Sequence, residues 1–188
     1  MYPPAHLSLK LRCLATLACT VLFIAMGTPM AVAAQHVPTA WRDLYYAAYK
    51  DKNAAQKLLD ITQAQQSPTP VLQGYRAVAA IMMCNHLQNP YSRLKYFYRG
   101  KNELEKAIAL SPADTELRFL RFAVQCNVPG ILNYAQNIPN DRQLLITYLL
   151  QTQNRQTDED LYKRIHRYMT NSSDVSEHDR KRLKAVQG

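Results

Sequence analysis

The chain has 188 residues, 47% of them hydrophobic, and a formal net charge of +9 at pH 7. This length corresponds to one domain and leaves little room for a second, and the apolar content is enough to build a core. In a cytosolic protein the basic charge would favour nucleic-acid binding, but the N-terminus argues against a nucleic-acid partner.

The N-terminus has the order of parts found in a secretory signal peptide: a basic start, an apolar run and a stretch of small residues. These parts are Lys10 and Arg12, residues 13–26 and residues 31–34. A retained membrane anchor needs roughly 18 unbroken apolar residues, and Gly27 and Pro29 interrupt the run. We therefore expect a signal peptide over 1–34 and a mature, periplasmic or secreted protein over 35–188. A lipoprotein anchored at Cys19 is the weaker alternative, because Leu17 lies one position too near that cysteine.

The expected mature protein is also basic. Removal of the signal takes two of the 23 basic residues and none of the 14 acidic ones, so residues 35–188 carry a net charge of +7. In an exported protein this charge suits anionic lipid head groups, cell-wall polymers or acidic partner proteins. Peripheral contact with an anionic envelope surface would involve the basic C-terminal tail helix, residues 170–188. A well-solvated surface explains the same charge equally well.

Seven helices and a small last helix are predicted along the rest of the chain, from apolar positions spaced three and four apart and from caps and proline breaks. Their expected ranges are 39–49, 53–65, 71–86, 90–110, 115–126, 139–151, 157–167 and 177–185. Thr69 with Pro70, and Asn89 with Pro90, place a cap before a first-turn proline. The stretch 77–84 is apolar on every face, which indicates a central, buried helix.

The predicted fold class is all-α. No stretch alternates apolar and polar residues as a half-buried strand would. The short turns indicate antiparallel helix pairs in one domain over 35–188, arranged either as a solenoid of helix pairs or as a compact bundle of about seven helices.

One predicted helix carries the pattern Gly100-x3-Leu104-x2-Ala107-x4-Pro112. This pattern resembles the second helix of a tetratricopeptide repeat, in which small residues let a neighbouring helix approach closely and proline ends the unit. Its partner would be the helix over 71–86, although the chain keeps no strict 34-residue period. The resemblance covers one degenerate repeat and implies a tetratricopeptide-like helix pair, within either a short solenoid or a compact bundle.

A second pattern extends over residues 74–141. It consists of Gly74, Tyr75, Asn89, Pro90, residues 95–97, Gly100, residues 104–108, residues 116–121, Gln125, Pro129 and residues 137–141. This run resembles an uncharacterised family of short exported helical proteins of the Bacteroidota type. The resemblance implies the helical fold and export, and it implies no activity.

The expected mature protein keeps two cysteines, Cys84 and Cys126. An oxidising compartment would permit a disulfide between them. Both follow apolar residues of predicted helices, where a free cysteine packs as a small hydrophobic residue. The free form is the favoured alternative.

Arg118 and Arg121 are the most notable polar pair. At a spacing of three they share one face of an otherwise apolar helix, and together they could hold a carboxylate or phosphate. The simpler interpretation is an internal ion pair with Glu103, Glu105 or Glu116, because guanidinium groups near a core need partners.

Tyrosines crowd the first four predicted helices. They are Tyr45, Tyr46, Tyr49, Tyr75, Tyr91, Tyr96 and Tyr98. An aromatic-lined groove could bind a peptide or glycan, whereas tyrosines that fill the seams of a small helical core are the simpler alternative. Tyr75, Tyr96 and Tyr98 are the candidate interaction residues.

No residue pattern predicts a reaction. The histidines have no partner at the spacing of a metal site, the serines lack a nucleophile elbow, and no glycine-rich phosphate loop exists. We therefore expect no catalytic residue, no metal, no cofactor and no small molecule, and a helical module that binds an unknown protein or peptide. The alternative is a periplasmic small-ligand carrier or enzyme with a polar site near Arg118 and Arg121.

Overall fold

Helices account for 77% of residues 37–186, the part of the chain that this computed structural model describes, and this part contains no strand. The all-α prediction is confirmed. The predicted signal peptide over 1–34 lies outside the described residues. Among the described helices, none has the length and apolar character needed to cross a membrane.

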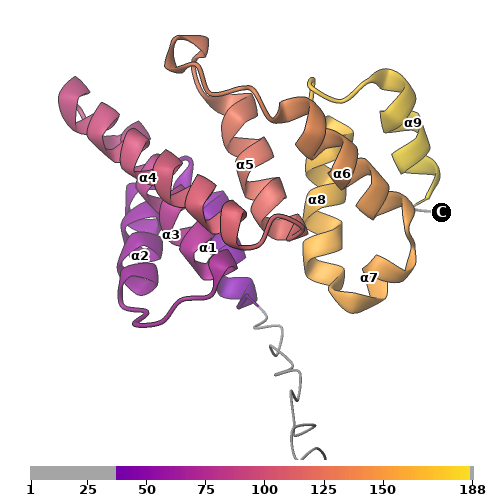
Figure 1. Cartoon of the computed structure of the whole chain (residues 1–188), viewed down its shortest axis with the longest axis horizontal. Coiled ribbons are helices and arrows are strands. Elements are labelled where there is room, and N and C mark those ends of the chain that lie inside the picture. The colour runs from indigo at the N-terminus through magenta and orange to yellow at the C-terminus, as the bar shows by residue number, and fades with distance from the viewer. Residues whose placement is uncertain (1–36, 187–188) are drawn as a thin grey trace, which may run out of the picture. The chain divides into compact units, whose positions relative to one another are not determined.

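The helices form two groups with α5 between them (Figure 1). The first group is α1 (Thr39–Ala48), α2 (Lys52–Gln63), α3 (Pro70–Met83) and α4 (Pro90–Leu110). The helix α5 (Thr115–Asn127) follows, and the second group is α6 (Ile138–Leu150), α7 (Gln153–Thr157), α8 (Glu159–Asn171) and α9 (Glu177–Ala185). Two 3-10 turns, η1 (Cys84–His86) and η2 (Gly130–Leu132), follow α3 and α5.

The helix starts show which predicted caps form. The Asn89 side chain accepts hydrogen bonds from the backbone N–H groups of Tyr91 and Ser92, as the cap before Pro90 predicts. Thr69 occupies the cap position of α3, but its hydroxyl makes no capping bond. Thr39, the first residue of the range predicted for the first helix, is the first residue of α1.

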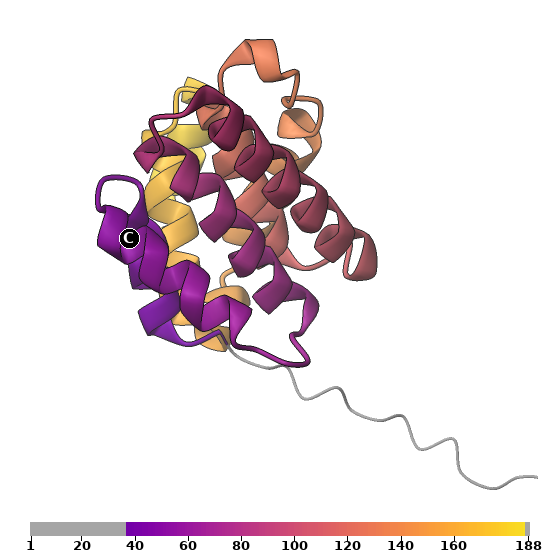
Figure 2. The same cartoon turned by 90° about the vertical axis from the view of Figure 1, so that its left-hand side faces the viewer.

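The third helix is central, as its apolar composition predicts. It packs against α1, α2, α4 and α5, and Figure 2 shows the first four helices gathered in front of the C-terminal ones. Gly100 permits a close approach of α4 to α3, because a Cβ added there would lie 2.5 Å from the Ala77 carbonyl oxygen. The small residue at this position therefore has the packing role that the pattern around it predicts.

Two hydrophobic cores meet at α5. Leu117, Leu120 and Val124 pack into the core of the first group, whereas Phe119 and Phe122 pack into the core formed with α6, α8 and α9. Because both faces of α5 are buried, this helix fixes how the two groups are joined.

The predicted basic tail helix is part of the folded domain. In α9, Leu183 is fully buried in the second core, and the His166 ring of α8 hydrogen-bonds the Leu183 carbonyl oxygen at 2.9 Å. The helix packs against α6 and α8, so it is anchored along its apolar side.

Candidate functional site: a tyrosine groove beside two ion-pair clusters

The predicted arginine pair meets an internal acid. Arg118 and Arg121 both form ion pairs with Asp141 of α6, which is fully buried. Arg121 also reaches Glu105 of α4 at 2.8 Å. Of the three acids that the sequence suggested, only Glu105 pairs with this arginine pair; Asp141 was not anticipated. The arginines therefore join α4, α5 and α6 and leave little capacity for an external anion.

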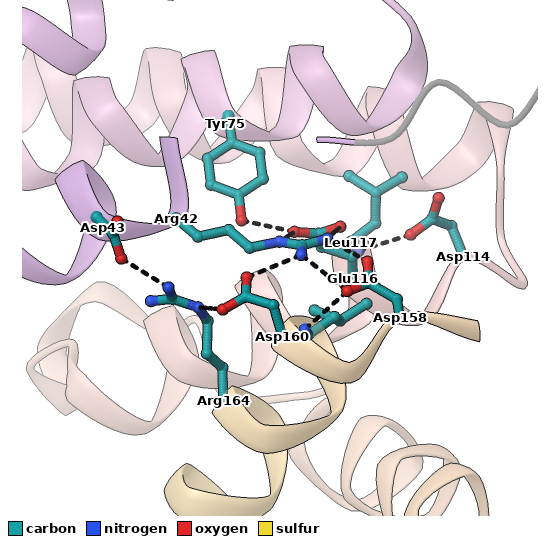
Figure 3. A network of polar contacts seen from close by, with 10 residues as sticks. Arg42, Asp43, Tyr75, Asp114, Glu116, Leu117, Asp158, Asp160 and Arg164 are labelled. Atoms are coloured by element: carbon teal, nitrogen blue, oxygen red, sulfur yellow. Dashed lines mark hydrogen bonds and ion pairs between the residues drawn. The ribbon is translucent and has the colours of Figure 1, made fainter. Parts of the chain in front are cut away.

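A second cluster surrounds Arg42 of α1, which is 1% exposed (Figure 3). Its guanidinium donates to both carboxylate oxygens of Glu116 at 2.8 Å. It also donates to Asp158 at 2.7 and 3.0 Å and to Asp160 at 3.0 Å. The Tyr75 hydroxyl donates to Glu116 at 2.6 Å. The cluster connects the first helix to α5 and to the start of α8.

The electrostatics of this cluster are those of a closed structural network. Burial lowers the pKa of Arg42, but the hydrogen bonds that it donates to Glu116 and Asp158 outweigh burial and raise the pKa above its ordinary value. Burial, with the nearby Glu116 charge, raises the pKa of Tyr75 well above its usual range. Because each charged group of the cluster has an oppositely charged partner inside the fold, we assign the cluster to holding α1, α5 and α8 together.

The three tyrosines predicted as interaction residues lie apart from one another. Tyr75 is 2% exposed and belongs to the first core. Tyr96 is half-buried on α4 beneath the Arg99 guanidinium, at 4.8 Å from the ring centroid. Tyr98 is exposed on α4 and contacts Phe97 edge-on. The structure does not bring Tyr75, Tyr96 and Tyr98 together into one site.

A different set of tyrosines lines a groove that extends from α8 past α1 to the first half of α4. The groove consists of three adjoining hollows of about 580, 310 and 340 Å³. All three share Asn127, at the end of α5. The middle hollow is lined by Tyr45, Tyr46, Tyr49, Ile81, Met82, Asn85, Ala123, Val124, Asn127, Val128 and Tyr168. We call the three hollows together the tyrosine groove.

Packing beneath the groove fixes its walls. The Tyr168 ring lies edge-on to Phe119 and Phe122, with centroids 5.5 and 6.0 Å away. The Tyr168 hydroxyl accepts a hydrogen bond from Asn127 at 2.9 Å. On the opposite wall, Tyr46 packs edge-on against buried Tyr45. The aromatic side chains are therefore held by the core and are presented in a defined orientation.

The ion pairs of α8 also support the groove. Arg164 bonds Asp43 of α1 at 2.6 Å and Asp160 at 2.8 Å, and it lies over the Tyr46 ring at 5.3 Å from the centroid. Partial burial raises the pKa of Tyr46 to about 12. The network of Figure 3 thus borders the groove and fixes α1 against α8.

Two arginines of the groove have no internal partner. Arg167 lines the hollow on the α8 side and Arg93 lines the hollow on the α4 side. Within residues 37–186, neither forms an ion pair with a carboxylate, and both are exposed. One acid, Asp174, also lines the hollow on the α8 side. The ends of the groove therefore carry unpaired positive charge.

Both cysteines are free thiols in the structure. Cys84 lies at the α4 end of the groove, with its sulfur 3.2 Å from the Arg93 carbonyl oxygen. Cys126 lines the hollow on the α8 side. Burial raises the pKa of the Cys84 thiol to about 11 and that of Cys126 to about 12. Neither thiol is activated as a nucleophile.

The groove combines apolar surface with groups that can form hydrogen bonds. Its apolar floor and aromatic walls can bury side chains, and amides such as Asn85 and Asn127 can bond a peptide backbone. In the described part of the chain, no group of three or more potential metal-ligating residues lies together.

Comparisons of the chain with protein-family models, with curated proteins and with solved structures found no match.

The groove was only partly foreseeable. The clustering of Tyr45, Tyr46 and Tyr49 near the N-terminus was visible, and both interpretations apply: Tyr45 fills the core, whereas Tyr46 and Tyr49 are 41% and 55% exposed in the groove. Tyr168 comes from a helix more than one hundred residues later, and no local pattern pairs it with α1. Likewise, no sequence motif around Arg42 indicates that its side chain is buried.

Proposed function

We propose that this chain is an exported helical scaffold that binds a segment of another protein or a peptide in the tyrosine groove. The observation that carries the proposal is the row of three hollows around Asn127, in which Tyr46, Tyr49 and Tyr168 are presented by packed helices. Exposed aromatic side chains in a preformed groove can supply the anchor contacts through which a polypeptide is recognised.

Several expectations from the sequence belong to this proposal. They are export through a signal peptide over 1–34, a periplasmic or secreted location, a role without catalysis or nucleic acid, and membership of the exported helical family with tetratricopeptide-like helix pairs. The basic composition of residues 35–188 is consistent with work at an anionic envelope surface.

The alternative, a carrier or enzyme with a site at Arg118 and Arg121, has less support. A carrier for an anion would need arginines without an internal acid, and both of these pair with buried Asp141. The hollow beside Arg118 is shallow and lined mainly by amide and hydroxyl side chains.

The proposal is tested by site-specific photo-crosslinking in the native cell. The photoreactive residue p-benzoylphenylalanine replaces Tyr49 in the groove, and in a control it replaces Tyr98, which is similarly exposed at 45% but lies outside the groove. We expect ultraviolet light to give a discrete protein adduct from position 49 that is absent from position 98. Adducts that are the same at both positions, or none at position 49, would count against the groove as a binding site.

A further inference from the structure

The charge at the two ends of the tyrosine groove indicates what kind of segment it accepts. Arg42, Arg118, Arg121 and Arg164 are each bound to carboxylates of the fold. Arg93 and Arg167 line opposite end hollows and, within residues 37–186, pair with none. The fold thus neutralises its buried arginines and leaves these two cations exposed in the groove.

Fewer acidic than basic side chains line the groove. The described residues that line the three hollows include one carboxylate, Asp174 in the hollow on the α8 side, against three guanidinium groups, those of Arg93, Arg164 and Arg167. The positive charge of the groove is also part of a wider excess, since residues 35–188 carry +7. An approaching segment therefore meets a positive field before contact and unpaired guanidinium groups at contact.

The centre of the groove is apolar, unlike its two charged ends. Between the two arginines, the middle hollow of about 310 Å³ has an apolar floor that includes Met82, Val124 and Val128. That volume can hold one large apolar or aromatic side chain. The exposed Tyr49 ring beside it offers an edge or face for stacking.

From this arrangement we infer that the groove binds an acidic peptide segment, with one apolar or aromatic residue in the middle hollow and carboxylates on both sides that pair with Arg93 and Arg167. The inference rests on the proposed function and adds the chemistry of the partner. Carboxylates suit these positions because an arginine can bind one through two parallel hydrogen bonds.

The test is selection from a random peptide library displayed on phage, with the purified protein as bait. We expect enriched sequences to carry Asp or Glu on both sides of one apolar or aromatic residue. For a synthetic peptide of the enriched sequence, Arg93→Gln and Arg167→Gln should each raise Kd roughly fivefold, the effect of an exposed charge contact. Higher salt should weaken binding to the unaltered protein.

Matched variants distinguish failure of the charge assignment from failure of the groove as a binding site. Arg99→Gln removes the same charge from an exposed arginine of α4 outside the groove and should leave Kd unchanged. Enriched peptides without acidic residues that still lose binding in Tyr46→Ala/Tyr49→Ala would overturn the charge assignment and leave the groove function intact. No enrichment over that double variant would count against both.

A lipid occupant gives a different result. In a parallel arm, vesicles of phosphatidylglycerol are mixed with the protein and with Arg93→Gln/Arg167→Gln. Vesicle binding that depends on these two arginines, together with no enriched peptide, would overturn the inference and assign the arginines to a membrane surface.

Discussion

Arg42 Nε lies 2.8 Å from Glu116 Oε1, and the two side chains are only 2% and 7% exposed. This bond joins the first helix of the described chain to α5, 74 positions later. Arg42 simultaneously holds Asp158 and Asp160 at the start of α8, so one guanidinium determines how three distant segments meet beside the groove.

Removing this guanidinium should strongly destabilise the fold. In Arg42→Ala, the buried Glu116 carboxylate loses its counter-charge, and we expect the free energy of unfolding to fall by about 3–5 kcal/mol. Urea titration followed by circular dichroism measures the change. The control is Lys163→Ala, which breaks an exposed pair with Glu159 and should cost no more than about 1 kcal/mol. Equal losses in the two variants would show that the Arg42 cluster contributes no more to the free energy of unfolding than an exposed ion pair does.

The contact of α4 with α3 should not tolerate a methyl group. In Gly100→Ala the added Cβ would lie 2.5 Å from the Ala77 carbonyl oxygen and 2.6 Å from Ile81 Cγ1, so the two helices must move apart. We expect a loss of about 1–3 kcal/mol in thermal or urea unfolding. Gly130→Ala is the control, because nothing lies within 4 Å of a Cβ at that position. An unchanged or higher stability of Gly100→Ala would contradict this close packing.

The thiols should be slow to react in the folded protein. Burial raises the pKa of Cys84 to about 11, so at pH 8 the thiolate fraction is roughly one hundredfold below that of an ordinary cysteine. We expect iodoacetamide to label Cys84 and Cys126 slowly in buffer and rapidly in concentrated urea. Fast labelling of the folded protein at pH 8 would refute the assignment.

The same shift has a consequence for stability. The folded pKa of Cys84 is raised, so its contribution to stability is fully present below the unfolded pKa and is lost as pH rises toward 11. Over that interval the unfolded chain releases a proton that the folded chain keeps. A Cys84→Ser variant should show less of this alkaline loss in urea titrations at rising pH.

Buried tyrosines should make the fold sensitive to alkali. Burial raises the pKa of Tyr45, Tyr75 and Tyr134 well above the ordinary tyrosine value. Below that value both states are protonated; above it the unfolded chain loses protons and unfolding is favoured. We expect tyrosinate absorbance and loss of helical circular dichroism to rise together in one alkaline transition. Full ionisation of all tyrosines while the helical signal persists is the result that would disprove this.

Much of the helical framework was predictable because its signals are local. Asn89 before Pro90 marks the start of α4, and the apolar stretch around Ala77 indicates the buried central helix. Such signals depend on backbone hydrogen-bonding needs within one turn, so neighbouring residues suffice to read them. The short α7 escaped prediction because it carries a weak local signal.

The candidate site was much less predictable. Arg118 and Arg121 were recognisable as a pair, and an internal ion pair was the simpler interpretation, yet their main partner, Asp141, lies on the next helix. Tyr46 and Tyr168 face one groove from helices at opposite ends of the described chain. Nothing in the spacing of either tyrosine indicates the other.

The sequence by itself determined the all-α class, the positions of most helices and the close approach of α4 to α3 at Gly100. Helix propensity, capping and apolar periodicity act over a few residues, so these features can be read locally. Only the tertiary structure decided which tyrosines are buried and which line a groove, and which arginines are neutralised inside the fold. Those outcomes depend on how α5 is packed between two cores, and contacts between residues far apart in the chain follow from that packing alone.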